Sequence, residues 1–238
     1  MTIQDSAPPP PPRRVYGRRQ NRPLNASRSQ AIEELLPRLS LEAECINNAP
    51  ASLDPKTLFC TPMTRFSLEI GFGSGERMAT LLPQNPDIGY LGAEPFINGM
   101  AAFLKSIYEE KPDNIRVLMD DAMLLVHALK DECLDDIYIL NPDPWPKKRH
   151  HKRRIVSQAN LDEFARTLKP GGKLIMTTDV PDLAEWMVTQ TTLHPSFRWT
   201  AKNAQEWKNP PTGWVPTRYE TKGAKGAESM VYLLFKRT

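Results

Sequence analysis

From residue 66 onward, short apolar runs alternate with longer stretches whose apolar residues recur at helical spacing. Short apolar runs bounded by turn residues are typical of buried strands. The pattern predicts strands at Phe66–Ile70, Gly89–Ala93, Ile115–Met119, Ile137–Leu140, Lys173–Met176 and Met230–Phe235. It predicts helices at Ile97–Tyr108, Ala122–Leu129, Ile155–Leu168 and Leu183–Val188, and one earlier helix at Ala31–Leu39.

This alternation of strands and helices predicts an α/β fold, with a mostly parallel sheet flanked by helices. Ligands bind such sheets at the carboxyl ends of the strands. Several predicted strands are followed by glycines, carboxylates or a proline-aspartate loop. We therefore expect the functional site at that edge of the sheet.

The first 25 residues have a different composition. A proline run, Pro8 to Pro12, precedes five arginines, and apolar side chains are scarce. Such a segment cannot bury enough surface to fold alone, so residues 1–25 are predicted to form a disordered Pro/Arg-rich arm. The arm is either a solvated tail or a segment that becomes ordered on RNA phosphates. The remaining residues, 26–238, suffice for one domain.

Composition excludes some classes of protein. The sequence has no apolar run long enough for a membrane span and no signal-peptide core, so we expect a cytoplasmic protein without membrane contact. Cys45, Cys60 and Cys133 are scattered, which predicts neither a disulfide framework nor a metal site. The net charge of +3 does not indicate a nucleic-acid partner, so the placement of the charge matters more.

A glycine loop, Glu69-Ile70-Gly71-Phe72-Gly73-Ser74-Gly75, follows the first predicted strand and leads into a helix. Gly71, Gly73 and Gly75 allow a sharp turn and close approach of a ligand. Their spacing lacks the interval of the pyrophosphate-binding fingerprint. Glu69 would repel a pyrophosphate but suits a ligand with an ammonium group. These features favour S-adenosylmethionine over a dinucleotide.

Two further acids follow predicted strands. Glu94 comes after the second strand, about twenty residues beyond the glycine loop, where an acid accepts ribose hydroxyls in related folds. Asp121 follows the third strand and precedes a predicted helix, so it caps that helix, contacts the adenine, or does both.

The loop after the fourth strand carries the most informative residues. Pro142 and Pro144 flank Asp143 and force an extended conformation, which suits a positioned base-recognition group. Trp145 either stacks on a nucleobase or packs the loop. The run Lys147–Arg154 has six Lys or Arg residues and two histidines in eight positions. Such a run is often a solvated face, but beside a functional site it favours phosphate binding.

Two downstream features also carry polar chemistry. Asp179 ends the fifth strand, where it either meets the substrate base or caps the next helix. The stretch near residues 200–228 is too irregular for another strand-helix unit. Within it, Thr217, Arg218, Tyr219 and Glu220 place a hydroxyl, a cation, an aromatic ring and a carboxylate together. From chemistry alone this could be a polar surface hairpin.

Taken in order, these motifs resemble the bacterial tRNA (guanine-N7)-methyltransferases, the TrmB family. The resemblance runs from about residue 66 to the C-terminus, with a looser likeness at Tyr16–Gln20 and Arg22–Leu24. It implies a class I, Rossmann-like methyltransferase fold and S-adenosyl-L-methionine as cofactor. It also implies methylation of a variable-loop guanine in tRNA. Asn141 departs from the aromatic residue of many relatives, and Pro146 from the histidine of some, which puts loop packing in doubt.

The resemblance also implies roles by position. Asp143 would be catalytic and would also contact the cofactor. The other implied cofactor contacts are Glu69, Gly71, Gly73, Gly75, Glu94 and Asp121. The implied substrate contacts are Lys147, Asp179, Thr217, Arg218, Tyr219 and Glu220, and the segment expected to touch RNA is His150, His151, Lys152, Arg153 and Arg154. We expect a monomer or small homo-oligomer with no obligate protein partner.

The chemistry of guanine N7 limits what Asp143 can do. N7 carries a lone pair and no proton, so its methylation needs no general base. The product ring is positively charged, and a nearby carboxylate can offset that charge or hold the N1 and N2 edge of the base. Our hypothesis is therefore that Asp143 orients guanine and stabilises its cation.

Other functions remain as alternatives. A methyltransferase for another RNA base would require proton management at an exocyclic amine, and Asp143 interrupts the Asn/Asp-Pro-Pro-aromatic loop of such enzymes. A non-catalytic RNA-binding module of the same fold is disfavoured by the glycine loop and its carboxylates. The loop spacing and Glu69 disfavour a nicotinamide oxidoreductase.

Overall fold

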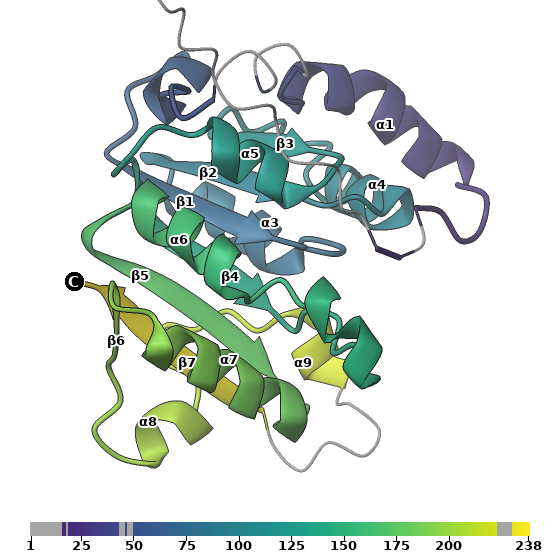
Figure 1. The fold of residues 1–238 in the computed structure, drawn as a ribbon. Helices are drawn as coiled ribbons and strands as arrows, with labels where there is room; N and C mark the ends of the chain where they lie inside the picture. Colours follow the sequence, from purple (N-terminus) through teal and green to yellow (C-terminus); the bar gives the residue numbers. More distant parts are fainter. Residues whose placement is uncertain (1–15, 18, 43–45, 47–49, 223–229) are drawn as a thin grey trace, which may run out of the picture.

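The computed structural model describes residues 16–17, 19–42, 46, 50–222 and 230–238. Seven strands in these ranges form one sheet in the order β3-β2-β1-β4-β5-β7-β6 (Figure 1). β1 to β5 pair in parallel, whereas β7 is antiparallel to β5 and β6. The predicted α/β fold with a mostly parallel sheet is confirmed. The strands are β1 (Arg65–Ile70), β2 (Ile88–Ala93), β3 (Ile115–Leu118), β4 (Leu134–Leu140), β5 (Leu168–Thr178), β6 (Phe197–Trp199) and β7 (Val231–Arg237).

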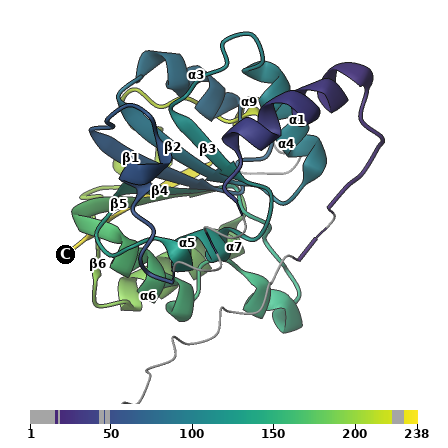
Figure 2. The ribbon, with the colours of Figure 1, turned by 90° about the horizontal axis from the view of Figure 1, so that it is seen from above.

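Helices cover both faces of the sheet (Figure 2). One face carries α1 (Ala26–Leu39), α3 (Glu76–Gln84) and α4 (Ile97–Ser106), and the other α5 (Ala122–Ala128), α6 (Gln158–Thr167) and α7 (Pro181–Leu193). Two short helices, α8 (Gln205–Lys208) and α9 (Arg218–Lys222), follow in the irregular segment, and 3-10 turns occur at Pro55–Leu58 and Lys148–Arg153. None of the described helices is long and apolar enough to cross a membrane.

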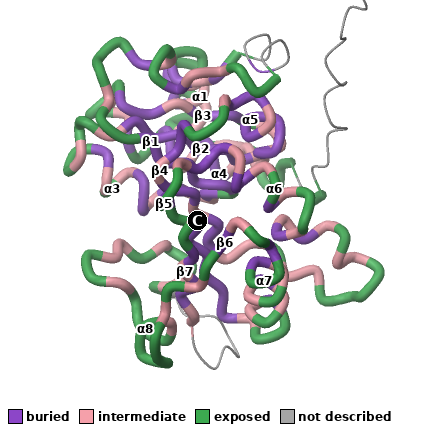
Figure 3. The backbone as a smooth tube through the Cα atoms, turned by 60° about the vertical axis from the view of Figure 1, so that its left-hand side comes forward, coloured by how far each residue is buried: buried purple, intermediate pink, exposed green. Residues whose placement is uncertain are grey.

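The alternation of side chains along the strands divides the core into two layers. On β1, Leu68 and Ile70 join the cluster formed with α5, α6 and α7. Ser67 and Glu69 alternate with them and therefore point to the opposite face. The cluster on that face is built from α1, α3 and α4 and includes Phe103. Figure 3 shows buried residues concentrated along the strands, whereas α8 lies at the surface.

Several helix ends are set by capping residues. α1 begins at Ala26, five residues before the predicted start, because the side chain of the capping residue Asn25 accepts a hydrogen bond from the Arg28 amide. Ser157 caps α6, so that helix begins at Gln158 rather than at the predicted Ile155. α7 is longer than predicted, and the short strand β6 was not predicted.

β5 begins earlier than the pattern predicted. It pairs with β4 already at Leu168, and a register irregularity follows before Lys173 pairs with Asp136. The residues between them include Gly171, whose φ of 77° is readily adopted only by glycine. The turn residues in this stretch hide the first part of the strand from the sequence pattern, and pairing with β4 resumes at Lys173.

The described part of the predicted arm lies against the domain. The Ile97 amide donates to the Arg19 carbonyl at 2.9 Å. The Asn21 amide donates to Asn98 Oδ1 at 2.9 Å, and Asn98 Nδ2 donates to the Arg22 carbonyl at 2.8 Å. These bonds fix the end of the arm at the start of α4. Residues 1–15 and Arg18 lie outside the described residues, so their disorder remains a prediction.

Gly75 joins the glycine loop to α3, and its replacement tests how tightly the loop is built. Its φ is 66°, and an added Cβ would lie 2.3 Å from Phe103 Cδ2. We expect Gly75→Ala to lower the free energy of unfolding by about 2–4 kcal/mol, from strain and overlap together. Gly171→Ala is the control, because its φ is 77° but nothing lies within 4 Å of the added Cβ. Urea denaturation should give a smaller loss for Gly171→Ala, and equal losses would contradict the overlap.

Candidate active site

A cleft of about 400 Å³ lies at the carboxyl ends of β1 to β4. Four of the predicted cofactor contacts line it: Gly71 after β1, Glu94 after β2, Asp121 after β3 and Asp143 after β4. Its volume lies within the usual range for small-molecule sites. The structure thus brings together most of the predicted cofactor contacts at the expected edge of the sheet.

The glycine loop takes a conformation that side chains would oppose. Gly71, Gly73 and Gly75 have φ of 70°, 59° and 66°. An added Cβ on Gly99 of α4 would lie 2.6 Å from the Gly73 carbonyl oxygen, so the loop and α4 are in close contact. The sequence pattern therefore reflects a backbone requirement at all three loop glycines.

Glu94 holds this loop in place. Its Oε2 accepts a hydrogen bond from the Gly73 amide at 2.7 Å, and its Oε1 accepts one from the Phe96 amide at 2.9 Å. Burial raises the pKa of the Glu94 carboxyl, these two bonds lower it, and the Asp143 charge raises it further. A carboxylate has about four acceptor positions, so Glu94 keeps capacity for ribose hydroxyls. Sequence reasoning assigned the ribose contact but missed the support of the loop.

Asp121 caps α5 at the floor of the cleft. Its Oδ1 accepts a hydrogen bond from the Met123 amide at 3.0 Å. The capping alternative is therefore confirmed. The residue also lines the cleft, so contact with the adenine remains a prediction.

Glu69 lies apart from the cleft. Its side chain is 4% exposed, and its Oε2 accepts a hydrogen bond from Arg77 Nη1 at 2.7 Å. Burial raises the pKa of the Glu69 carboxyl, and the Arg77 guanidinium lowers it. The structure gives one oxygen of Glu69 a partner on the α3 side of the sheet, and the expected contact with the cofactor ammonium stays a prediction. This partner left no signal in the sequence pattern.

Asp143 stands at the mouth of the cleft on a strained loop. Asn141 and Trp145, on either side of the Pro-Asp-Pro sequence, have φ of 50° and 43°. Such values cost on the order of 1–3 kcal/mol each for residues other than glycine, and they cluster at functional sites. The residue is exposed, and partial desolvation of its carboxyl raises the pKa of Asp143. A carboxylate held here is available to a ligand that enters the cleft.

Trp145 packs the loop, which is one of the two roles predicted for it. Its ring is edge-on to Tyr16, with centroids 6.2 Å apart, and edge-on to His150 at 5.9 Å. The Arg153 guanidinium carbon lies 4.9 Å from the Trp145 ring and 5.0 Å from the Tyr16 ring. Tyr16 and Arg153 both line the cleft. Sequence reasoning missed Tyr16 as a cleft residue, although an aromatic ring in a segment with few apolar residues was a usable signal.

The cationic run divides into an outer and an inner part. Lys147, Lys148, Arg149 and Lys152 are exposed. Arg154 is 3% exposed, with Nε donating to the Pro144 carbonyl at 2.9 Å and Nη2 paired with Asp182. Arg154 therefore supports the Asp143 loop from behind, which differs from its predicted position on an RNA-contacting surface.

The two histidines of the run are also partly turned inward. Burial lowers the pKa of His150, and the neighbouring cations, Arg153 first, lower it further. The His151 ring is edge-on to Trp186 at 5.4 Å. Both rings thus help to hold the turn Lys148–Arg153 on the domain.

The residues Thr217 to Glu220 form a compact element at the rim. Glu220 Oε1 accepts from the Thr217 amide at 3.1 Å and from Thr217 Oγ1 at 3.0 Å, and Oε2 accepts from Trp214 Nε1 and Tyr232 Oη at 2.9 and 3.2 Å. Four bonds use the acceptor positions of one carboxylate. Glu220 therefore holds the element together, and this hydrogen bonding distinguishes it from a free surface hairpin.

This element faces the Asp143 loop and the end of β5. Asn141 Nδ2 donates to Thr217 Oγ1 at 3.5 Å, and the Tyr219 hydroxyl donates to Asp179 at 3.0 Å. Asp179 is buried and does not cap α7, whose N-terminal cap residue is Val180 without a side-chain bond. Tyr219 is 47% exposed, and Arg218 is 3.8 Å from Glu76. The structure thus places Asp179 and the element on the rim next to Asp143.

Comparison with known proteins assigns the family. The family described as "Putative methyltransferase" matches residues 64–233. A tRNA (guanine-N(7)-)-methyltransferase of Chelativorans sp. is 43% identical over 93% of this chain and 94% of its own. A second, of Rhodospirillum rubrum, is 40% identical over 94% of this chain and 88% of its own. The chain belongs to the tRNA (guanine-N7)-methyltransferase family. The predicted resemblance is confirmed.

Solved structures agree on the fold. The 16S rRNA methyltransferase KamB aligns with a TM-score of 0.51 at 13% identity, covering 77% of this chain and 91% of its own. TrmN from Thermus thermophilus aligns with a TM-score of 0.51 at 15% identity, covering 77% of this chain and 47% of its own. At these identities the likeness concerns the methyltransferase fold alone.

The division of the cationic run predicts unequal effects on stability. Arg154→Ala removes the bond to Pro144, the ion pair with Asp182 and the packing on Trp186, whose ring centroid lies 5.0 Å away. We expect the free energy of unfolding to fall by about 2–3 kcal/mol. Lys152→Ala, two residues away and exposed, is the control and should leave stability unchanged. Urea midpoints measure both, and a neutral Arg154→Ala would show that this side chain does not support the loop.

Proposed function

We propose that this chain transfers the methyl group of S-adenosyl-L-methionine to N7 of a variable-loop guanine in tRNA, which forms 7-methylguanosine. The observation that carries the proposal is the single rim shared by Asp143, at the cofactor cleft, and the Thr217–Glu220 element, joined through Asn141. The relatives are named for the same reaction. A basic outer surface adjoins this rim, which suits a folded RNA.

The cleft residues fit the cofactor. S-adenosyl-L-methionine, when bound, supplies an electrophilic methyl group. Glu94 offers acceptor positions for ribose hydroxyls, Asp121 lies where the adenine would contact it, and the three loop glycines allow close approach of the ligand. Tyr16 and Trp145 line the cleft and pack edge-on against each other.

Asp143 acts on charge and orientation. Methylation of N7 by the bound cofactor would remove no proton from the base and would leave the guanine ring positively charged, and an ionised Asp143 would offset that charge. Tyr219 and Arg218 are available to stack on or bond the guanine and its neighbours, while Glu220 and Asp179 fix the element from below.

We further infer that the chain works in the cytoplasm, where tRNA is the substrate, as a monomer or small homo-oligomer. One chain supplies both the cofactor cleft and the substrate element, which supports activity without a protein partner. Lys147, Lys148, Arg149 and Lys152 are proposed as the phosphate contacts of the run.

The proposed reaction is tested by methyl transfer from labelled S-adenosylmethionine to unmodified tRNA transcripts, with nucleoside mass spectrometry. We expect 7-methylguanosine, and we expect it to disappear when the variable-loop guanine is replaced. Asp143→Asn should lower kcat by about 10²–10³-fold, because a neutral amide cannot offset the cation. Asp113→Asn, an exposed carboxylate paired with Arg38, is the control and should retain activity.

The pH profile tests the same role of Asp143. Because its pKa is raised, the carboxylate is lost on acidification before an ordinary aspartate would be protonated. The kcat of the wild-type chain should therefore fall about tenfold per pH unit below that pKa, and Asp143→Asn should lack this acid limb. A different methylated nucleoside would contradict the assignment of guanine N7 as the methyl acceptor. A near wild-type rate for Asp143→Asn would contradict the role of the Asp143 charge.

The salt dependence of tRNA affinity tests the outer cations. Replacement of Lys148, Arg149 and Lys152 by alanine should make the slope of log affinity against log salt shallower by about 2–3. Three exposed lysines elsewhere, Lys56, Lys105 and Lys111, form the control set. Filter binding over a range of salt concentrations gives both slopes. An equal slope in the two triple variants would mean that the run is a solvated face.

A further inference from the structure

Arg77 is a buried cation directly behind the glycine loop. It is the second residue of α3, which begins after Gly75, and its side chain is 7% exposed. Its Nη1 donates to Glu69 Oε2 at 2.7 Å, and Glu69 directly precedes Ile70 and the loop. The guanidinium therefore contacts the end of β1 on the face of the sheet that carries α3. None of the roles described so far uses it.

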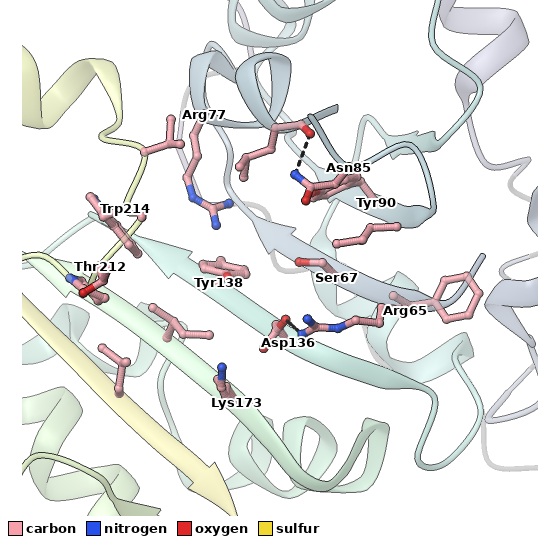
Figure 4. Close-up of a pocket in the computed structure, with 18 residues that line it drawn as sticks. Arg65, Ser67, Arg77, Asn85, Tyr90, Asp136, Tyr138, Lys173, Thr212 and Trp214 are labelled. Carbon is pink, nitrogen blue, oxygen red and sulfur yellow. Dashed lines mark hydrogen bonds and ion pairs between the residues drawn. The ribbon is translucent and has the colours of Figure 1, made fainter. Parts of the chain in front are cut away.

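The same guanidinium touches two other parts of the site. Its carbon lies 3.8 Å from the centroid of Tyr138, on the strand that leads to the Asp143 loop. It lies 5.6 Å from the centroid of Trp214, in the segment that leads to Thr217. Figure 4 shows Arg77 approaching Tyr138 from α3, with Trp214 beside them at the same end of the cavity. Planar stacking of this kind suits arginine and not lysine.

Trp214 carries the contact on to the substrate element. Its Nε1 donates to Glu220 Oε2 at 2.9 Å, and its ring is edge-on to Tyr232 at 5.3 Å. Glu220 in turn bonds Thr217 and Tyr232. A continuous series of contacts thus runs from Glu69 through Arg77 and Trp214 to Glu220.

These contacts matter because a cavity lies beside them, between the sheet and the segment that carries Trp214. About 290 Å³ of open space separates α3 and the sheet from the segment 211–215. Lys173 and Arg65 line its other end (Figure 4). Because the segment does not pack continuously on the sheet, local contacts must set its position. Arg77 and Trp214 bridge the two walls next to the functional site.

We propose that Arg77 and Trp214 are positioning residues that hold the Thr217–Glu220 element in register with the glycine loop for tRNA binding. The proposal rests on the proposed function and adds two residues to it. Trp214 acts on the substrate element alone, through Glu220. Arg77 acts on both the glycine loop and the substrate element, because it contacts Glu69, which precedes the loop, and Trp214, which precedes the element.

The charges around Arg77 agree with this arrangement. Glu69 accepts a hydrogen bond from it, and the Glu220 charge also acts on Glu69. Burial raises the pKa of Glu69, the Arg77 charge lowers it, and Glu220 raises it. The guanidinium therefore offsets the repulsion that Glu69 experiences from Glu220.

Trp214→Leu tests the proposal. It removes the stacking on Arg77 and the donor to Glu220, so we expect tRNA affinity to fall and the KM for tRNA to rise about tenfold. The Kd for S-adenosylmethionine and kcat at saturating tRNA should stay within about twofold of wild type. Trp207→Leu is the matched control, since Trp207 lies in the same irregular segment against Lys208 and should change neither constant.

Arg77→Lys extends the test to the cofactor side. The lysine keeps a positive charge for Glu69 but cannot stack on two rings. We expect both the KM for tRNA and the Kd for S-adenosylmethionine to rise. In the Arg77→Lys background, Trp214→Leu should raise the KM for tRNA by less than it does in the wild-type chain, because the contact with Arg77 is already lost and only the bond to Glu220 remains to be removed. Additive effects of the two changes would overturn the link between them.

The remaining outcomes also decide the proposal. If Trp214→Leu fails to fold, Trp214→Phe keeps a ring but not the donor and should raise the KM for tRNA about threefold. An unchanged KM for tRNA in a folded Trp214 variant, or equal losses of tRNA and cofactor affinity in that variant, would assign Trp214 a purely structural role. Fluorescence anisotropy measures tRNA affinity without catalysis. Failure of the wild-type chain to make 7-methylguanosine would therefore count against the reaction and not against this link.

Discussion

The parallel register of β1 with its two neighbours positions the rest of the site. Ile70 lies opposite both Ala93 of β2 and Ile139 of β4, so the three strands end at one level. The residues that follow them, at the glycine loop, Glu94 and the Asp143 loop, are thereby brought to one edge although they are far apart in sequence. Glu94 then fixes the spacing with its two backbone bonds. Every polar contact described for the cofactor depends on this alignment, which hydrophobic burial on both faces maintains.

Three buried charges hold parts of the site in position in this protein. Arg77, Arg154 and Glu94 are each less than a tenth exposed, and each joins elements that carry different parts of the site. Replacing a buried ion pair by apolar side chains often costs little stability, whereas removing one partner leaves an uncompensated charge. Arg154 behind the Asp143 loop and Arg77 behind the glycine loop thus fix two loops whose backbones lack regular hydrogen bonding. The outer lysines remain exposed and keep their charge for an external partner.

Much of the fold and part of the site could be predicted from the sequence. Apolar periodicity located the parallel strands, because buried strands read as continuous apolar runs, and residues after the strands located the cleft. The periodicity did not show the early start of β5, where turn residues occupy a bulge, or the cap at Ser157. It also could not show which way a charged side chain turns. Glu69 and Arg154 were both predicted from their sequence neighbours to face ligands, and each also has a partner within the chain, Arg77 and Asp182, that leaves no periodic signal in the sequence.

The two strained residues of the Asp143 loop have a consequence for timing. Asn141 and Trp145 keep left-handed backbone conformations on either side of Pro142 and Pro144, and Arg154 donates a hydrogen bond to the Pro144 carbonyl. The chain therefore meets the entropic cost of ordering this loop once, during folding, and not at every encounter with a substrate. A loop that is already ordered has few alternative shapes to search, so the rate of a productive encounter depends on how the RNA arrives rather than on how the protein rearranges. The Asp143 carboxylate is in this sense preorganised in the native state.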